Sequence, residues 1–522
     1  MKRLLNLLIF FLALSQSVMG QDKRIKILPS ENISYRDEAN FPGADILIGE
    51  VKIAHEGAIL TCKKAFYYQE KNFFKAIGDV KINQGDTLIQ TSDYVDYDAD
   101  RKFALSWGNV ILRDLKMTLT TDTLSFNRED QIMIYDTSGK IVDGENILTS
   151  NRGKYFAGLK KFTAKNDVVV TTPKDTIYSD HLDYYTEIDQ AYLYGPSDIY
   201  SEGNHIYTEK GFYDANTQIS HLVKNAKIDY GDRLVQGDSL YYDAQQSFAS
   251  ASGNFKLTDT LNNWIQKGDY AEVFRELDSV FITKRAVAVT EMENDSLYIH
   301  GDTMVVTGPA DKRIIKAAHF VKFFKSDFRG KCDSLVYTEE FGKTKMYYEP
   351  VIWAEENQIT GDSIFVLSNL ETNQLDSLKI LNNAFMVSSD SLGYNQIRGK
   401  NMLGKFRENK LHSLLVNGNA EVLNYGRDES GELIGITKKQ ASKIKFFFNE
   451  NKVIRMNFMS QPDGNTYPLS QFPETEVKLK GFIWREEEKP LVVEDIFLKG
   501  ARSKARLTKP ATIKSIDERS IL

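Results

Sequence analysis

Cysteine and proline are scarce in this chain of 522 residues, which has 2 Cys and 11 Pro. Cys62 and Cys332 stand far apart in the sequence, so nothing indicates that they pair, and we expect two buried free thiols. A network of disulfides is therefore excluded as the source of the fold. Few prolines together with 11% aromatic residues favour extended strands, because aromatic and β-branched side chains pack well on a pleated surface.

Long hydrophobic runs are also absent after the N-terminal segment. No later stretch approaches the ~20 apolar residues that a membrane-spanning helix needs. The N-terminal segment has Lys2 and Arg3, an apolar run over residues 4–14 and small residues up to position 20. This order predicts a cleaved signal peptide over residues 1–20 and an exported chain, with a buried N-terminal helix as the alternative.

A net positive charge and the motifs of common enzymes are lacking too. The formal net charge is -6 and the pI is about 5.8, which excludes a general nucleic-acid binder. The 7 histidines are scattered without metal-ligand spacing, and there is no phosphate-binding loop, nucleophile elbow or CxxC motif. We therefore expect neither a metal, a cofactor nor catalysis.

What the chain does contain is a short phrase that returns at a fixed distance. "GDSLYYDA" at residues 237–244 has a polar residue, here called the anchor, followed by apolar residues at positions +2 and +4. Regular anchors recur at intervals of 29 residues, and looser copies follow at intervals of 29 to 42. Such a period indicates a repeat protein whose units bury their apolar faces by stacking. The regular anchors are Lys64, Asp93, Asp122, Asn151, Asp180, Glu209 and Asp238, and the looser ones are Asp269, Asp302, Asp333, Asp362, Lys400 and Ser442.

Within a repeat, apolar and polar residues alternate, which predicts a half-buried strand. Another apolar residue often stands three before the anchor, as at Ile177 and Val235, and extends the same strand. A second strand follows a polar turn and often contains a glycine, such as Gly78, Gly108 or Gly253, which predicts a β-bulge. The apolar face is the candidate functional surface. Its residues are Phe66, Tyr68, Val95, Tyr97, Leu124, Phe126, Leu182, Tyr184, Leu240, Tyr242, Met304, Val306, Leu335, Tyr337, Ile364 and Val366.

Two all-β architectures fit this pattern. An elongated repeat array of antiparallel strands, curled into a roll, agrees with the short turns and the clean alternation of faces. A right-handed parallel β-helix with one coil per repeat is the alternative. The acidic anchors, Asp93 through Asp362, are expected to be solvated carboxylates and not calcium ligands, because they lack the close Gly and Asp spacing of calcium-binding repeats.

Segments such as "LTTDTLSFNREDQIMIYDTSGKI" and "IYSDHLDYYTEIDQAYLYGPSDI" resemble the OstA-like, or LptA-like, family. The resemblance extends from about Asp45 to Asn457 and is clearest between Lys64 and Leu257. It implies a semi-closed, twisted β-jelly roll in the periplasm that carries lipopolysaccharide toward the outer membrane. The family also supplies the periplasmic N-terminal domain of the outer-membrane lipopolysaccharide translocon.

This resemblance implies a bridge protein without catalysis, in which the apolar face forms a groove for the acyl chains of lipid A. Its partners would be lipopolysaccharide and inner- and outer-membrane transport components with similar β-rolls, joined by end-to-end strand pairing. Head-to-tail self-association would use the same edges. The alternative is a secreted β-solenoid that binds or cleaves polysaccharide with clustered carboxylates.

The predicted organisation has four parts. A signal peptide occupies residues 1–20, regular repeats occupy 21–260, less regular repeats occupy 261–480, and a basic C-terminal tail occupies 481–522. The tail is expected to be solvated. The basic and aromatic stretch "KFFKSDFRGK" at residues 322–331 interrupts the regular spacing and is a candidate lateral opening or contact surface.

Overall fold

Strands make up nearly all of the structure, a computed structural model that describes residues 24–500 apart from 86–87, 115–116, 202, 293–294, 311, 373, 429 and 451. The predicted signal peptide and residues 501–522 of the predicted tail lie outside the described residues. The chain divides into two compact units, Met1–Ala226 and Lys227–Leu522, which are described separately. The predicted boundaries at residues 260 and 480 concern the regularity of the repeat and stay predictions.

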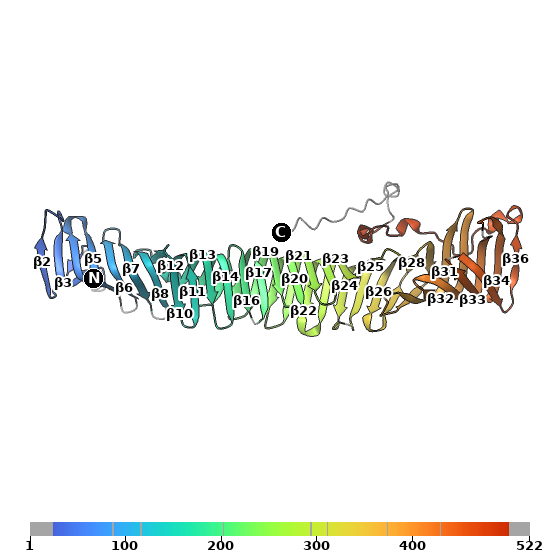
Figure 1. The fold of residues 1–522 in the computed structure, drawn as a ribbon, viewed down its shortest axis with the longest axis horizontal. Coiled ribbons are helices and arrows are strands. Elements are labelled where there is room, and N and C mark those ends of the chain that lie inside the picture. Colours follow the sequence, from blue (N-terminus) through green and yellow to red (C-terminus); the bar gives the residue numbers. More distant parts are fainter. Residues whose placement is uncertain are drawn as a thin grey trace, which may run out of the picture. The chain divides into compact units, whose positions relative to one another are not determined.

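The strands of the first unit follow one another in chain order (Figure 1). They are β1 (Lys26–Ile27), β2 (Asn32–Arg36), β3 (Asp45–His55), β4 (Ala58–Tyr68), β5 (Phe73–Gln84), β6 (Leu88–Asp98), β7 (Phe103–Arg113), β8 (Met117–Asn127), β9 (Ile132–Tyr135), β10 (Gly139–Asp143), β11 (Asn146–Ser150), β12 (Arg152–Phe156), β13 (Lys161–Thr171), β14 (Asp175–Tyr185), β15 (Gln190–Leu193), β16 (Ser197–Ser201), β17 (Asn204–Thr208) and β18 (Lys210–Asp214); β19 (Ile219–Asp229) includes the boundary.

The strands of the second unit are longer near its C-terminal end. They are β20 (Arg233–Asp243), β21 (Phe248–Asp259), β22 (Trp264–Phe274), β23 (Ser279–Glu291), β24 (Ser296–Thr307), β25 (Ile314–Phe324), β26 (Phe328–Thr338), β27 (Lys343–Tyr347), β28 (Val351–Ala354), β29 (Asn357–Thr360), β30 (Ser363–Ser368), β31 (Leu375–Asp390), β32 (Gly393–Arg407), β33 (Lys410–Arg427), β34 (Leu433–Asn449), β35 (Lys452–Met459) and β36 (Asp463–Tyr467).

Helical structure among the described residues is limited to short 3₁₀ turns. Four of them connect strands, and four follow β36. They are η1 (Gln69–Lys71), η2 (Ala157–Leu159), η3 (Arg275–Leu277), η4 (Glu339–Phe341), η5 (Leu469–Gln471), η6 (Glu474–Glu476), η7 (Glu486–Glu488) and η8 (Val493–Phe497).

Neighbouring strands run antiparallel wherever the register of described residues is defined, as in β13–β14, β20–β21 and β31–β32. The all-β antiparallel prediction is confirmed, and the alternative of a parallel β-helix is wrong. The physical reason lies in the connections: turns of a few residues join antiparallel neighbours, whereas parallel neighbours need long crossovers.

Several long strands, among them β5, β7, β13 and β21, bend at a two-residue bulge. In β7, Gly108 and Asn109 have φ angles of 76° and 50°, and the register with β8 shifts between Trp107 and Val110. Register shifts also occur at the predicted glycine bulges of β5 and β21. In other repeats the bend separates two short strands, such as β9 and β10. We call this bend the corner.

The corner divides each repeat into two walls. Wall A is the half that carries the +2 and +4 residues, such as Phe103–Trp107 of β7, and wall B is the other half, such as Val110–Arg113. Side chains alternate between buried and exposed along both halves, so each wall has one buried face. In each unit the two buried faces enclose a common interior, which is the arrangement of a semi-closed β-jelly roll.

In the second unit, residues 468–500 cover part of the outer face of wall B, and we call this segment the strap. Figure 1 shows the strap, in red, returning from β36 toward β25. Leu479 packs with Phe385 and Tyr425, and Ile496 packs with Val287 and Val289. The prediction of a solvated tail is therefore wrong for residues 481–500, because apolar outer-face side chains hold them against the sheet.

Candidate functional site: the interior between the two walls

The +2 residues form a row across wall A of each unit. In the first unit, register pairs connect Val95 through Ser106 to Leu124. Later strands of that unit connect Ala164 to Leu182 in the same way. The row of the second unit runs through Leu240, Ala251, Ala271, Ile282, Met304, Ala317, Leu335, Met346, Ile364, Ile380, Met402, Val416 and Ile444.

The +4 residues form a parallel row closer to the tip of wall A. Tyr97 pairs with Ala104, which pairs with Phe126, and Phe162 pairs with Tyr184. The corresponding row of the second unit includes Tyr242, Ala249, Val273, Val280, Val306, Ile315, Tyr337, Thr344 and Val366. The sequence pattern thus brings seven of its eight candidate pairs into these two rows.

The first candidate pair requires a correction. Ala65 and not Phe66 is in register with Ala76 and Leu47, and Tyr67 pairs with Phe74. Phe66 and Tyr68 therefore project from the opposite face of β4, where the Phe41 ring covers Phe66 at a centroid distance of 4.5 Å. The equivalent residues are Ala65 and Tyr67, because the interval to the second repeat is 30 residues and not 29.

Wall B contributes its own apolar row to the same interior. In the first unit Leu119, Ile141, Leu148, Val170, Ile177, Ile199 and Ile206 are consecutive register partners, and several of them are the apolar residues found three before an anchor. Hydrogen bonds join the walls across the interior. The His55 Nδ1 atom of wall B lies 2.7 Å from the Tyr97 hydroxyl of wall A, and Gln90 donates to the Ser106 hydroxyl.

This interior is closed over most of its described length. Of the fourteen candidate side chains that lie in these rows, thirteen are buried and Tyr337 is half-buried. Burial raises the pKa of Tyr97 and of Tyr184, so both phenols stay neutral at physiological pH. The candidate surface is thus a packed core with small gaps, and a guest molecule needs the walls to separate locally.

Polar bridges connect the turns at the two wall tips, along a line that we call the seam. In the first unit, Lys102 forms an ion pair with Glu56 at 3.0 Å, and Lys160 pairs with Asp114 at 2.8 Å. The hydrogen bond from Lys102 lowers the pKa of Glu56. Arg128 also reaches across the seam and donates to the Gln84 side chain at 3.3 Å.

The second unit has seam bridges as well. Arg233 pairs with Asp278 at 3.1 Å, and Arg313 pairs with Asp259 at 2.7 Å. The second pair is buried, with side chains 7% and 5% exposed. Taken together, the seam bridges tie each roll shut through ion pairs that are half-buried, apart from the buried Arg313–Asp259 pair.

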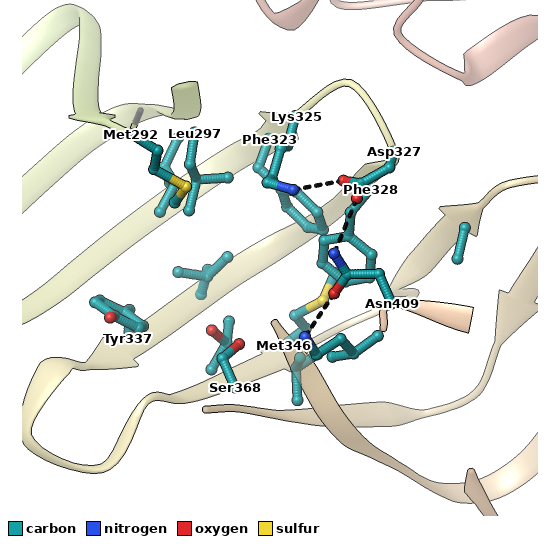
Figure 2. A pocket seen from close by; sticks show the side chains of 16 residues that line it. Met292, Leu297, Phe323, Lys325, Asp327, Phe328, Tyr337, Met346, Ser368 and Asn409 are labelled. Atoms are coloured by element: carbon teal, nitrogen blue, oxygen red, sulfur yellow. Dashed lines mark hydrogen bonds and ion pairs between the residues drawn. The ribbon is translucent and has the colours of Figure 1, made fainter. Parts of the chain in front are cut away.

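A cavity of about 110 Å³ opens at the seam of the second unit. Its apolar lining comes from both walls and includes Ile299 and Phe323 of wall B and Leu335, Met346 and Val366 of wall A. Figure 2 shows these surroundings together with the polar side chains of Lys325, Asp327 and Asn409 at one side. A smaller cavity of about 30 Å³ lies beside Tyr97 and Phe126 in the first unit.

The acidic anchors lie at the corner. Asp93 accepts a hydrogen bond of 2.8 Å from the bulge residue Asn109, and Asp238 accepts one of 2.9 Å from Asn254. In another repeat the anchor is the donor and the bulge residue is the acceptor: Asn151 donates to Asp167 at 2.6 Å. Among the described residues, no three His, Cys, Asp or Glu side chains gather closely enough to hold a metal ion.

The basic stretch at residues 322–331 serves two structural purposes. Lys322 is buried and donates to the strap carbonyl oxygen of Leu498 at 2.6 Å. Lys325 lies at the cavity mouth. The stretch for which we expected a lateral opening or contact surface therefore lies beside the cavity of about 110 Å³.

The two cysteines are free and buried, as expected. Burial raises the pKa of the Cys62 thiol to about 11 and that of Cys332 to about 12. Neither thiol is ionised at neutral pH, so neither is a reactive nucleophile.

Within the described part of the chain, no helix is long and apolar enough to cross a membrane.

Comparisons with known proteins place the chain as follows. No curated protein matches it. Among solved structures, the chain is similar to LptH, described as "the LptA homologous periplasmic component of the conserved lipopolysaccharide transport device from Pseudomonas aeruginosa". The two are 17% identical, and the match covers 26% of this chain and 81% of LptH. The TM-score is 0.14, which is too low to carry an argument. Residues 22–180 match the family described as OstA-like protein. This match covers less than a third of the chain, and it shows that residues 22–180 are similar to the OstA-like family.

Proposed function

We propose that this protein is a periplasmic lipopolysaccharide-binding bridge that shelters the acyl chains of lipid A between its two walls during transport to the outer membrane. The supporting observation is the pair of continuous apolar rows on wall A, opposed by the row on wall B. A sheltered path needs continuity along the strands and no catalytic group.

The energetics favour such a path. Each CH₂ group removed from water contributes about 0.8 kcal/mol, so exposing one chain of about twelve carbons costs on the order of 10 kcal/mol. Successive repeats offer similar linings, as in Leu240, Met304 and Leu335. Neighbouring positions then differ little in free energy, and a lipid can move along them without a deep trap.

The closed interior means that a lipid must displace contacts between the walls. Solvent-accessible ion pairs such as Lys102–Glu56 contribute only about 0.2–1 kcal/mol each. Local separation of a few bridges is therefore within reach of the free energy that acyl burial supplies. In this mechanism the corners act as hinges, the seam opens, and the sugars and phosphates of the lipid remain in water.

Docking to partners would use the edge strands. β2 pairs with β3, and its residues Ile33 and Tyr35 are exposed. β35 pairs with β34 and exposes Ile454, at 66%. Exposed apolar side chains on a strand edge suit the addition of a strand from another β-roll. We propose inner- and outer-membrane components with similar rolls as partners, and head-to-tail association of copies as a further possibility.

Lipid extraction tests this function. The full chain is purified without detergent from cells that make lipopolysaccharide, and the extract is analysed by mass spectrometry. Bound lipopolysaccharide is expected at a substantial fraction of one molecule per chain. A secreted β-roll of unrelated function from the same cells is the control. Absence of lipid together with bound or degraded glycan would instead support the polysaccharide alternative.

A further inference from the structure

The cavity in the second unit reaches the seam and, at about 110 Å³, is larger than the cavity of about 30 Å³ beside Tyr97 and Phe126 in the first unit. Its lining extends from Leu335 and Met346 in the inner row of wall A to Asn409 in the turn between β32 and β33. Ile299 and Phe323 of wall B lie opposite. The cavity therefore connects the proposed lipid path with the surface.

The mouth of this cavity is polar but offers no unpaired cation. Lys325 pairs with Asp327 at 2.7 Å and lies 3.9 Å from Asp295. Asn409 donates to Asp327 at 3.3 Å and accepts a hydrogen bond of 2.8 Å from the Leu375 backbone nitrogen. Figure 2 shows these bonds as one chain. Such a mouth does not select an anion, whereas the lining behind it suits hydrocarbon.

The contact that spans the seam here is a hydrogen bond and not an ion pair. Asn409 and Asp327 form a single amide–carboxylate hydrogen bond of 3.3 Å. The bridges Arg313–Asp259 and Lys102–Glu56 join opposite charges at 2.7 and 3.0 Å. In the two ion pairs opposite charges attract each other, whereas at Asn409 only the acceptor is charged and the bond is long, so it is the weaker contact. Among these bridges, the seam gives way most readily at Asn409.

We propose that this cavity is a lateral port, through which one unbranched acyl chain passes between the seam and the interior, with Asn409 and Asp327 as its latch. The inference rests on the proposed function and adds a place of access to it. At about 110 Å³ the cavity is smaller than the roughly 150 Å³ that admits benzene. It receives the end of a chain, and the remainder follows as the walls separate.

A twelve-carbon fatty acid with a diazirine at its terminal carbon tests the port with the full chain. After illumination, peptide mapping should find adducts concentrated on cavity residues such as Leu335, Met346 and Val366. Val366→Phe fills the cavity and should reduce these adducts about tenfold. This is the loss of affinity expected when two CH₂ groups of the fatty acid can no longer be buried. Leu367→Phe, on the outward neighbour, is the matched control and should label normally.

Two further variants keep the test decisive. Thr344→Leu, opposite Val366 in register, replaces the first variant if that one does not fold. Asn409→Ala removes the latch and should speed labelling at least about twofold. Adducts that persist unchanged in the filled variants, or that spread evenly along the inner rows, overturn the port but leave the proposed function standing. Absence of adducts from all inner rows overturns both.

Discussion

The side chain of Asn109 donates a 2.8 Å hydrogen bond to Asp93, sixteen positions before it, and fastens the bulge of β7 to the neighbouring strand β6. Asn225 and Glu209, at 2.6 Å, and Asn254 and Asp238, at 2.9 Å, repeat the arrangement at the same separation. Several repeats therefore contain a fastened corner. The anchors of these corners, Asp93, Asn151, Glu209 and Asp238, are separated by 29 residues or by twice that number.

The corner depends on a backbone that glycine adopts easily. A Cβ atom at Gly108, where φ is 76°, would lie 2.7 Å from Asp93 Oδ2. Gly108→Ala should therefore lower the free energy of unfolding by about 1–3 kcal/mol, measured by urea unfolding. Gly158→Ala, where a Cβ meets nothing within 4 Å, should change it little. Equal effects of the two substitutions would contradict the role given to the corner.

The buried seam bridge should matter more for stability than an accessible one. Arg313→Met leaves the Asp259 carboxylate without its guanidinium partner in a buried place and should cost about 3 kcal/mol. Lys102→Met, which breaks the more exposed pair with Glu56, should cost less than about 1 kcal/mol. Thermal unfolding of both variants gives the comparison. A larger loss for Lys102→Met would show that burial does not set the strength of the seam.

The strap is held by buried amide side chains. Gln396 donates to the Val477 carbonyl oxygen and accepts from the Leu479 nitrogen, both at 2.8 Å. Gln396→Ala leaves these strap groups unsatisfied and should destabilise the strap by about 1–3 kcal/mol. Hydrogen exchange over residues 477–485 should accelerate accordingly. Gln440→Ala, at an exposed position of β34, is the control, and similar exchange in both variants would contradict the assignment.

Acid should loosen the other end of the strap. His300 is buried, bonds the Ala286 carbonyl oxygen at 2.8 Å, and touches the Phe497 ring. Burial lowers its pKa below the ordinary 6.5, an effect that Lys499 and Lys322 reinforce and Asp302 opposes. The folded state thus favours the neutral imidazole, so its stability is complete above about pH 6.5 and falls as the pH drops through the lowered pKa.

Exchange protection of residues 493–498, corrected for intrinsic rates, measures this loosening between pH 7.5 and pH 5. Protection should fall with acid in the natural chain. His300→Gln cannot titrate at this position and should show much less pH dependence. A fall of the same size in both proteins would mean that other groups control the strap.

Much of the fold could be predicted because alternation and period are local properties of the sequence. Leu182 and Tyr184 are two positions apart, so they lie on the same face of their strand whatever its neighbours are. The register of the first repeat could not be read in this way. The alternation alone does not show whether Ala65 or Phe66 faces the interior. The pairing of Ala65 with Ala76 decides this, because a one-residue shift in register exchanges the two faces of a strand.

The seam and the strap could not be predicted, because they join residues far apart in the chain. Lys102 meets Glu56 through the bend of the walls, and no local pattern reports such a contact. The sequence does contain a pattern that indicates the strap. Consecutive apolar runs at 286–289, 351–354 and 384–387 break the alternation, and a strand that is buried on both faces has this appearance. The spacing of sixteen between corner partners is likewise a regularity of the sequence.

Site-specific photocrosslinking in cells that make lipopolysaccharide tests the central claim most directly. A photoreactive amino acid is placed at the inward positions Leu182, Leu240 and Met304 and, in separate proteins, at their outward neighbours Asp183, Tyr241 and Val305. Acyl chains between the walls predict lipopolysaccharide adducts at the inward positions and few or none at the outward ones. Adducts at the outward positions alone, or none at the inward ones, would contradict a lipid path through the interior.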